Sequence, residues 1–164
     1  MRRQIYSPPP EPQTKTLLLQ VYQGFEQRLT AAIKERGHPD FRAKHSAVLA
    51  HIDAEGTRLS TLSDRAAMSR PAMLQLVDEL ESKGYVRREP DPYDRRAKLI
   101  VPTEKGKDQI SVAIEVAENL EQQLRELLGR QQYRTLRRIL GYLYTHYSLE
   151  SVSVQPRAAY AYQQ

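Results

Sequence analysis

The sequence predicts a mainly α fold with one small β-hairpin, and three observations support that prediction. Apolar residues recur at helical spacing over long stretches near both ends of the chain, residues 14–37 and 104–147. Shorter helical patterns lie between these stretches. Two short strand-like segments, joined by a loop rich in turn residues, follow the shorter patterns. We therefore expect residues 41–103 to form a central lobe of short helices and a hairpin, flanked by the outer helices.

The N-terminal part of the chain is expected to begin without regular structure. Residues 1–13 contain four prolines, which lack the backbone N–H that a helix requires, so we expect a flexible proline-rich arm. The amphipathic helix over residues 14–37 then ends before Pro39. A second, shorter helix is expected over residues 41–54, because Gly56 interrupts the apolar pattern.

Two further helices, separated by a very short turn, are expected over residues 60–67 and 70–83. Ser69 suits the N-cap of the second helix, and Pro71 suits its first turn, where a missing N–H costs nothing. Gly84 follows where a glycine commonly ends a helix. The sequence therefore predicts a tight pair of helices.

A basic hairpin follows these helices. Strands are expected over residues 85–89 and 97–101, and the loop between them is rich in proline and aspartate. A basic loop on a rigid hairpin suits the narrow minor groove of DNA, whose negative potential attracts arginine. The alternative is a solvated turn with surface ion pairs. The basic residues expected to gather at the tip of the hairpin are Arg87, Arg88, Arg95, Arg96 and Lys98.

Two short helices followed by a hairpin is the order of a winged helix-turn-helix, whose second helix enters the major groove. Gln75 lies opposite the apolar face of that helix and can pair with adenine, and Leu74 on its flank can touch a thymine methyl. Acidic residues gather at its C-terminal end, so we expect DNA to meet the half that begins at Arg70. A packing element with incidental polar residues is the alternative. The apolar face, expected to be buried, comprises Met73, Leu76, Val77 and Leu80.

The outer helices predict a homodimer. The C-terminal one begins after Thr103, keeps near-heptad apolar spacing, and is broken at Gly129; residues 148–164 are expected to form an irregular tail. Together the outer helices carry more apolar surface than one small lobe can cover. The residues expected at the dimer interface are Leu18, Tyr22, Phe25, Leu120, Leu124, Leu127, Leu136, Ile139, Leu140 and Leu143.

Composition excludes several other classes of protein. The net charge of +5 and pI near 9.5 favour a polyanionic partner, although the charge alone is weak support. The absence of cysteine excludes disulfides and thiol chemistry, and four histidines without cysteine argue against a metal site. No catalytic triad order or glycine-rich phosphate loop occurs, so we expect neither an enzyme nor a cofactor. Without a signal peptide or a membrane-length apolar run, we expect a cytoplasmic protein with no membrane partner.

The central motifs closely resemble those of the MarR family of bacterial regulators, and the resemblance covers residues 14–147. The trailing motif Thr103–Gly106 is similar to the family's L-T-x-x-G, with Pro102 in place of the leucine, and Asp94–Arg96 is similar to its D-x-R wing motif. Ala67 stands where the family's turn often carries glycine. The helix segments that carry the resemblance are Leu62–Arg65, Ser69–Pro71, Leu76–Asp78 and Leu80–Arg88.

The resemblance implies roles for individual residues. Asp94 would orient Arg96, which would enter the minor groove, and the outer helices would build a two-fold dimer. Leu74 and Gln75 differ from the residues that family members often carry, so the resemblance does not supply the operator sequence. The DNA-binding residues expected from motif and resemblance together are Ser69, Arg70, Pro71, Leu74, Gln75, Asp94, Arg95, Arg96 and Lys98.

The regulatory input remains open between a small organic effector and none, since the family's peroxide sensors need a cysteine that this chain lacks. The resemblance implies a pocket between the dimer helices and the DNA-binding lobe, usually for aromatic or phenolic anions. Four residues have suitable chemistry, although an ordinary surface or core position is the favoured interpretation of each: Tyr22, Arg28, Arg42 and His45.

These inferences predict a sequence-specific transcriptional regulator, expected to be a repressor, that binds double-stranded DNA as a homodimer on a palindromic operator. The competing interpretation is a helical dimeric interaction or ligand-sensing protein that keeps the fold without strong DNA binding. Salt-dependent binding to duplex DNA distinguishes the two, because only the first neutralises phosphates.

Overall fold

The computed structural model describes residues 11–148 and the side chains of all but a few of them. The predicted irregular tail lies outside the described residues apart from Ser148, and so does most of the predicted proline-rich arm, residues 1–10. Within the described part, no helix combines the length and the apolar character needed to cross a membrane.

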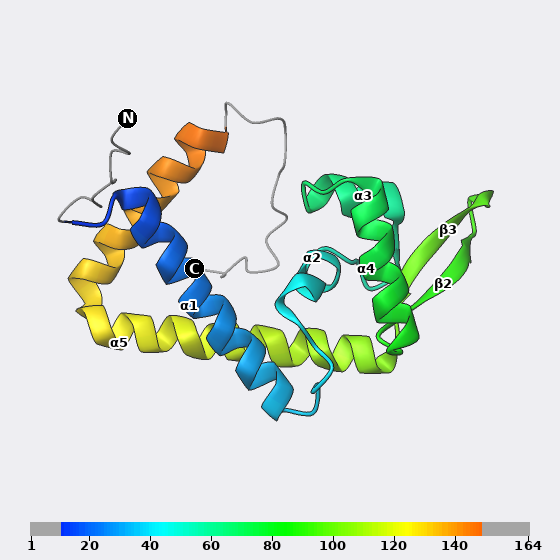
Figure 1. The fold of residues 1–164 in the computed structure, drawn as a ribbon, viewed down its shortest axis with the longest axis horizontal. Coiled ribbons are helices and arrows are strands. Elements are labelled where there is room, and N and C mark those ends of the chain that lie inside the picture. The colour runs from blue at the N-terminus through cyan, green and yellow to red at the C-terminus, as the bar shows by residue number, and fades with distance from the viewer. Residues whose placement is uncertain (1–10, 149–164) are drawn as a thin grey trace, which may run out of the picture.

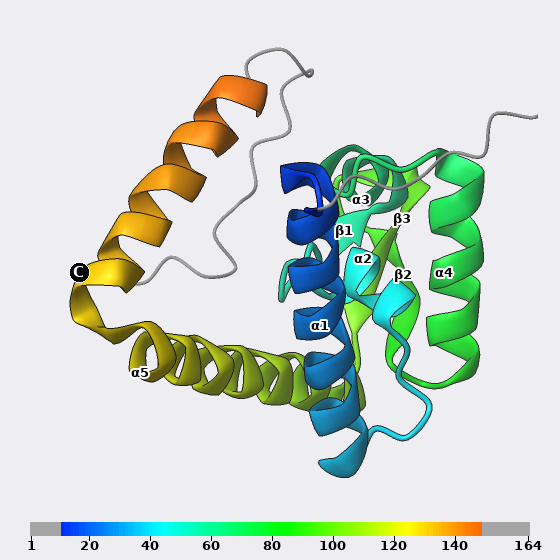
Figure 2. The same cartoon turned by 60° about the vertical axis from the view of Figure 1, so that its left-hand side comes forward.

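Two long helices frame a smaller lobe (Figure 1). Helix α1 (Thr14–Glu35) crosses the first half of α5 (Glu104–Ser148), and the lobe with its projecting hairpin lies at the N-terminal end of α5. At Gly129 the backbone adopts φ 71° and ψ 163°, so α5 bends there, which confirms the predicted helix break. Beyond the bend, α5 stands away from the lobe in both views (Figure 2).

The segment after α1 contains less helix than the sequence predicts. Instead of one helix over residues 41–54, a 3-10 turn (η1, Ala43–His45) leads into a single helical turn (α2, Ser46–Leu49). The guanidinium of Arg65 donates a hydrogen bond to the His51 carbonyl at 2.7 Å, and the Thr57 hydroxyl accepts one from the Asp53 N–H at 2.8 Å. These side chains satisfy backbone groups that a longer helix would have paired within itself.

The helix pair has the predicted caps. Helix α3 (Leu59–Arg65) is followed by α4 (Arg70–Ser82), and the Ser69 hydroxyl accepts the Ala72 N–H at 3.4 Å as an N-cap should. Gly84 has φ 74°, as a residue just beyond a helix often does. In the turn between the helices, Ala67 adopts a left-handed φ of 50°, a conformation that favours glycine.

The hairpin belongs to a three-stranded antiparallel sheet of order β1-β3-β2. The predicted strands are longer than expected, β2 (Val86–Asp91) and β3 (Asp94–Pro102), so only Pro92 and Tyr93 remain as the turn. The third strand, β1 (Thr57–Arg58), was not predicted, because two residues cannot show an alternating pattern.

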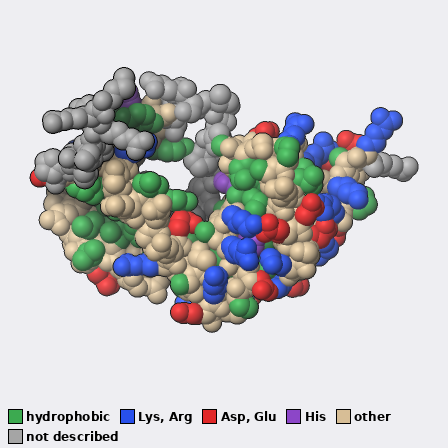
Figure 3. Space-filling model, in the orientation of Figure 1, with side chains coloured by type: hydrophobic (Ala, Val, Ile, Leu, Met, Phe, Trp, Pro, Cys, Tyr) green, Lys and Arg blue, Asp and Glu red, His purple; other side chains and the backbone are tan. Residues whose placement is uncertain are grey.

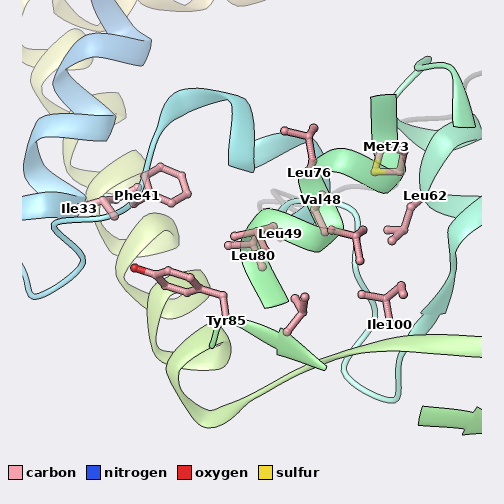
Figure 4. Packing of buried hydrophobic residues seen from close by; sticks show 12 residues of the cluster. Ile33, Phe41, Val48, Leu49, Leu62, Met73, Leu76, Leu80, Tyr85 and Ile100 are labelled. Atoms are coloured by element: carbon pink, nitrogen blue, oxygen red, sulfur yellow. The ribbon is translucent and has the colours of Figure 1, made fainter. Parts of the chain in front are cut away.

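The core lies between α4, the sheet and the beginning of α5 (Figure 4). The predicted apolar face of α4 is confirmed as buried, with every member at most 6% exposed. Side chains from α1 and the following loop complete the core from the other side. The principal buried residues are Ile33, Phe41, Val48, Leu49, Leu62, Met73, Leu76, Val77, Leu80, Tyr85, Val86 and Ile100.

The lobe is joined to α5 through the Thr103–Gly106 motif. The Thr103 hydroxyl donates to the Gly84 carbonyl at 2.6 Å, and the Thr103 N–H donates to the Tyr85 carbonyl at 3.0 Å. A Cβ at position 106 would lie 2.1 Å from the same Tyr85 oxygen, so only glycine fits this contact. The motif therefore fixes how α5 leaves the sheet.

Candidate nucleic-acid interface

The N-terminal half of α4 exposes polar, apolar and positively charged side chains to solvent. Arg70, Pro71 and Gln75 are exposed, and Leu74 is 42% exposed on the flank. Among the described residues, Arg70 forms no ion pair with a carboxylate. Positive charge at a helix N-terminus, where backbone N–H groups also point outward, provides a binding surface for phosphate.

The acidic C-terminal half of α4 is used within the fold. The guanidinium of Arg88 lies 2.5 Å from Asp78 and also contacts Glu81. Glu79 accepts a hydrogen bond from Lys44 at 2.5 Å, which lowers the pKa of this carboxyl together with a second bond from His45. DNA can therefore approach the N-terminal half without meeting free carboxylates from this helix.

Two of the basic hairpin residues lie away from its tip. Arg88 is turned toward α4, and Arg87 pairs with Glu89 at 2.6 Å near the base of β2. This differs from the expectation that all five basic side chains gather in the loop. The reason is the length of β2, which places both residues well before the turn.

The outer part of the hairpin, the wing, carries the cations that remain free. Arg96 and Lys98 on β3 are exposed, and neither forms an ion pair with any carboxylate that the structure describes. Tyr93 in the turn is 96% exposed. Lys and Arg side chains are visible at the far end of this projection in Figure 3. The side chain of Arg95, also predicted to bind DNA, lies outside the described residues.

Asp94 contacts the backbone of Arg96, where the resemblance implied that it would orient the side chain. Its Oδ1 accepts the Arg96 backbone N–H at 3.1 Å, and its Oδ2 lies 3.8 Å from Nη2 of Arg58. Asp94 therefore fixes the main chain that carries Arg96, and leaves the guanidinium of Arg96 free to meet a ligand.

Arg58 on β1 and Asp91 on β2 form a contact beside the wing that the sequence does not predict. Nε of Arg58 donates to Oδ2 of Asp91 at 2.7 Å, although the two residues lie on different strands. Asp91 is only 4% exposed, and the Tyr93 backbone N–H and Arg58 hold the pKa of its carboxyl below the usual range. No pattern in the sequence connects residues 33 positions apart, so this pairing had to be seen in the fold.

A cavity of about 560 Å³ lies between α1, α2 and the first half of α5. Its wall is mainly apolar, with Phe25 and Leu29 on one side and Ile110 and Ile114 on the other. The side chain of Gln109 is also part of this wall, and its buried Oε1 accepts no hydrogen bond from any described residue. The cavity occupies the position that the family resemblance implies for an effector.

The four residues proposed for effector binding are not brought together. Tyr22 lines a more open groove between α1 and the η1–α2 segment, whereas Arg28 and Arg42 line neither this groove nor the cavity. His45 is fully buried beneath α4, where its Nε2 lies 3.3 Å from Glu79. In the part of the chain that is described, no group of three His, Asp or Glu side chains could hold a metal ion.

Comparison with known proteins identifies the same unit. The sequence model of the MarR family matches residues 40–97. The transcriptional regulator HosA of Escherichia coli O111:H- is 29% identical over 93 residues, which are 56% of this chain and 67% of that protein. The uncharacterized regulator YcgE of Bacillus subtilis strain 168 is 45% identical over 49 residues, 30% of this chain and 32% of that protein.

Solved structures share the fold over most of the chain. A MarR transcriptional regulator from Methanosarcina mazei Go1 superposes with a TM-score of 0.67 at 20% identity, covering 83% of this chain and 96% of that one. CouR from Rhodococcus jostii RHA1, solved with p-coumaroyl-CoA bound, gives 0.64 at 26% identity, covering 80% and 90%. The relatives matched in sequence are named as transcriptional regulators, and none is named as an enzyme. The central segment, residues 40–97, is that of the MarR family of winged helix-turn-helix transcriptional regulators, and most of the chain shares the fold of solved members of that family.

Proposed function

We propose that this regulator is a sequence-specific repressor that binds a palindromic operator as a homodimer. The observation that carries the proposal is the pairing pattern of its charges. The cations of the N-terminal half of α4 and of the outer wing, Arg70, Arg96 and Lys98, have no carboxylate partner among the described residues, whereas the carboxylates of α4 pair with cations inside the fold. Such a surface matches the phosphates of a duplex on both sides of the recognition helix.

A dimer is supported by apolar side chains that one chain leaves in water. Leu18 on α1 is 47% exposed, Leu127 beside the α5 bend is 81% exposed, and Ile139 beyond it is 48% exposed. Large apolar side chains left this exposed on the long helices favour an interface with a second copy. The interface residues predicted from the sequence all lie on α1 and α5, and they remain a prediction.

A two-fold dimer presents two copies of α4 and two wings, and its operator is then expected to be palindromic. Occupation of a promoter by such a dimer blocks other proteins from the same DNA, which supports a repressor role. Selection of bound fragments from the genome of the source organism identifies the operator. Sedimentation that shows a concentration-independent monomer would refute the dimer.

The salt dependence of binding tests whether the cationic surface acts as proposed. Two wings and two helix N-termini together contact several phosphates, so affinity for the selected operator is expected to fall on the order of 10³-fold between 50 and 200 mM salt. Binding that does not change with salt, or no binding to any duplex, favours the competing interpretation of an interaction protein that keeps only the fold.

We further propose that the 560 Å³ cavity binds an aromatic effector that carries a hydroxyl group. CouR, whose structure holds a phenolic acyl-CoA, supports an aromatic ligand in this fold. The apolar walls suit a ring, and the unpaired Oε1 of Gln109 would accept a hydrogen bond from a phenolic hydroxyl. Arg137 lines the same cavity, where its Nη1 lies 3.7 Å from Oε1 of Glu121, so an anionic group of the effector would compete with that carboxylate for the guanidinium.

Calorimetry with p-coumarate and with cinnamate, which lacks the hydroxyl, tests this assignment. Binding of p-coumarate is expected to be tighter in the unmodified protein, and Gln109→Leu is expected to abolish the difference. Gln123→Leu is a matched control, because Gln123 is an exposed glutamine on the same helix that bonds Asn119 at 3.0 Å. If Gln109→Leu leaves the preference for p-coumarate intact, Gln109 does not bind the hydroxyl.

A further inference from the structure

The turn of the wing brings two carboxylates face to face. Asp91 and Asp94 form the last pair of the β2–β3 ladder, and only Pro92 and Tyr93 separate them. Like charges directly opposite each other across two strands destabilise the pair. A hairpin that closes on two aspartates therefore needs a cation at that point to keep its turn closed.

Arg58 supplies that cation from the far side of the sheet. It lies on β1, which is separated from β2 by the central strand β3. Its Nη2 lies 2.5 Å from Oδ2 of Asp91 and 3.8 Å from Oδ2 of Asp94, so a single guanidinium meets both carboxylates. Arginine suits this position because its planar group offers several donors in a fixed geometry.

The remaining oxygens of the two aspartates fix the backbone of the turn and of the residues that follow. Oδ1 of Asp91 accepts the Tyr93 N–H at 2.9 Å, and Oδ1 of Asp94 accepts the Arg96 N–H at 3.1 Å. A continuous set of contacts thus runs from β1 in the lobe to the main chain of Arg96.

We propose that Arg58 is a positioning residue for DNA recognition: by neutralising Asp91 and Asp94 it holds the wing so that Arg96 meets the minor groove. This inference rests on the proposed DNA-binding function. It makes Arg58 important for binding without direct contact between Arg58 and DNA, although 45% of its side chain is exposed.

A double-mutant cycle distinguishes positioning from direct contact. The probe is the duplex that the unmodified protein selects from a random-sequence pool. Arg58→Ala is expected to weaken binding about 10-fold, and Arg96→Ala at least as much. The double variant is expected to bind no more weakly than Arg96→Ala alone, because Arg58 acts through Arg96. Losses that multiply in the double variant would overturn the proposal.

Two further variants control this cycle. Arg87→Ala removes the same charge from the same sheet but breaks an exposed ion pair, with Glu89, so it is expected to change affinity less than about 2-fold. Asp91→Asn is expected to weaken binding as Arg58→Ala does, although it makes the surface more positive. Tighter binding by Asp91→Asn would show that net charge, and not wing position, governs affinity, and would overturn the proposal.

Amide hydrogen exchange tests the same contacts without DNA. In Arg58→Ala the Tyr93 and Arg96 amides are expected to exchange several-fold faster, while amides within α4 keep their rates. Unchanged exchange at Tyr93 and Arg96 would overturn the proposal even if the variant bound DNA poorly. If the unmodified protein selects no duplex, the proposed function fails, and faster exchange would still support the role of Arg58 in holding the wing.

Discussion

The two parts of this chain that we propose bind DNA are held in place by different kinds of interaction. Helix α4 is fixed by a continuous apolar face, in which Met73, Val77 and Leu80 are fully buried. The wing projects beyond the core, and its tip is fixed by the ionic contacts of Arg58 with Asp91 and Asp94. The first kind of contact involves no charge, whereas the second joins the half-exposed guanidinium of Arg58 to one buried and one half-exposed carboxylate. The element proposed to read bases is therefore held by apolar packing, and the element proposed to enter the minor groove is held at its tip by charge.

The largest expected effect comes from the buried side of α4. Leu80→Ala removes a fully buried side chain and is expected to lower the free energy of unfolding by about 2–5 kcal/mol. Leu74→Ala is the matched control on the exposed side of the same helix, with an expected change below about 0.5 kcal/mol. Denaturant unfolding of both variants checks the contrast. Equal destabilisation by the two changes would contradict the assignment of the two faces.

The second comparison concerns what each part recognises. Gln75→Ala is expected to cost about 1–3 kcal/mol on the selected operator and to relax base preference at one position per half-site, because its amide can pair with a base edge. Arg96→Ala is expected to weaken binding to all sequences and to reduce the salt slope, because the minor groove carries a degenerate code. Titration of both variants against the operator and a scrambled duplex measures the difference. An equal loss on both duplexes for Gln75→Ala would show that it contacts no base.

The sequence predicts α4 well and the contacts that hold the wing poorly. The buried face of α4 and the Ser69 cap depend on residues within one or two helical turns, so spacing alone predicted both. Strand β1 and its Arg58–Asp91 contact depend on residues far apart in the chain, and no local pattern marks them. Local propensity also predicted too long a helix after residue 41, because the side chains of Arg65 and Thr57 form hydrogen bonds with backbone groups there.

A smaller effect is expected in the turn that joins α3 to α4. Ala67 has φ 50°, a conformation that costs an L-residue about 1–2 kcal/mol relative to glycine. Ala67→Gly relieves that strain but makes the unfolded chain more flexible, so a net gain of about 0.5–1 kcal/mol in stability is expected. Ala66→Gly is the control, because Ala66 has an ordinary φ of −88° and gains nothing. Thermal unfolding measures both, and a less stable Ala67→Gly variant would contradict the strain argument.

The smallest expected effect is a pH dependence of stability, which should differ between His45, packed beneath α4, and the wing. Burial lowers the pKa of His45 from its ordinary value of 6.5, and this outweighs the hydrogen bond to Glu79, which raises it. The Arg42 backbone N–H donates to its Nδ1 at 3.2 Å, so protonation of that nitrogen would also break a backbone contact. In the folded protein His45 therefore takes up its proton at a lower pH than in the unfolded chain, which binds a proton as pH falls through 6.5.

Stability is thus expected to decline as pH falls below 6.5, and His45→Gln is expected to remove this part of the decline. The wing behaves differently, because the lowered pKa of Asp91 contributes stability that is fully present above the ordinary carboxyl value of 3.8 and is lost only as pH falls through the depressed value. Unfolding free energies measured from pH 7 to 5 in both proteins, with amide exchange at Tyr93, separate the two regions. A lower protection factor for the Tyr93 amide at pH 5 than at pH 7, or an unchanged pH dependence in His45→Gln, would mean that the two sites do not titrate as their contacts imply.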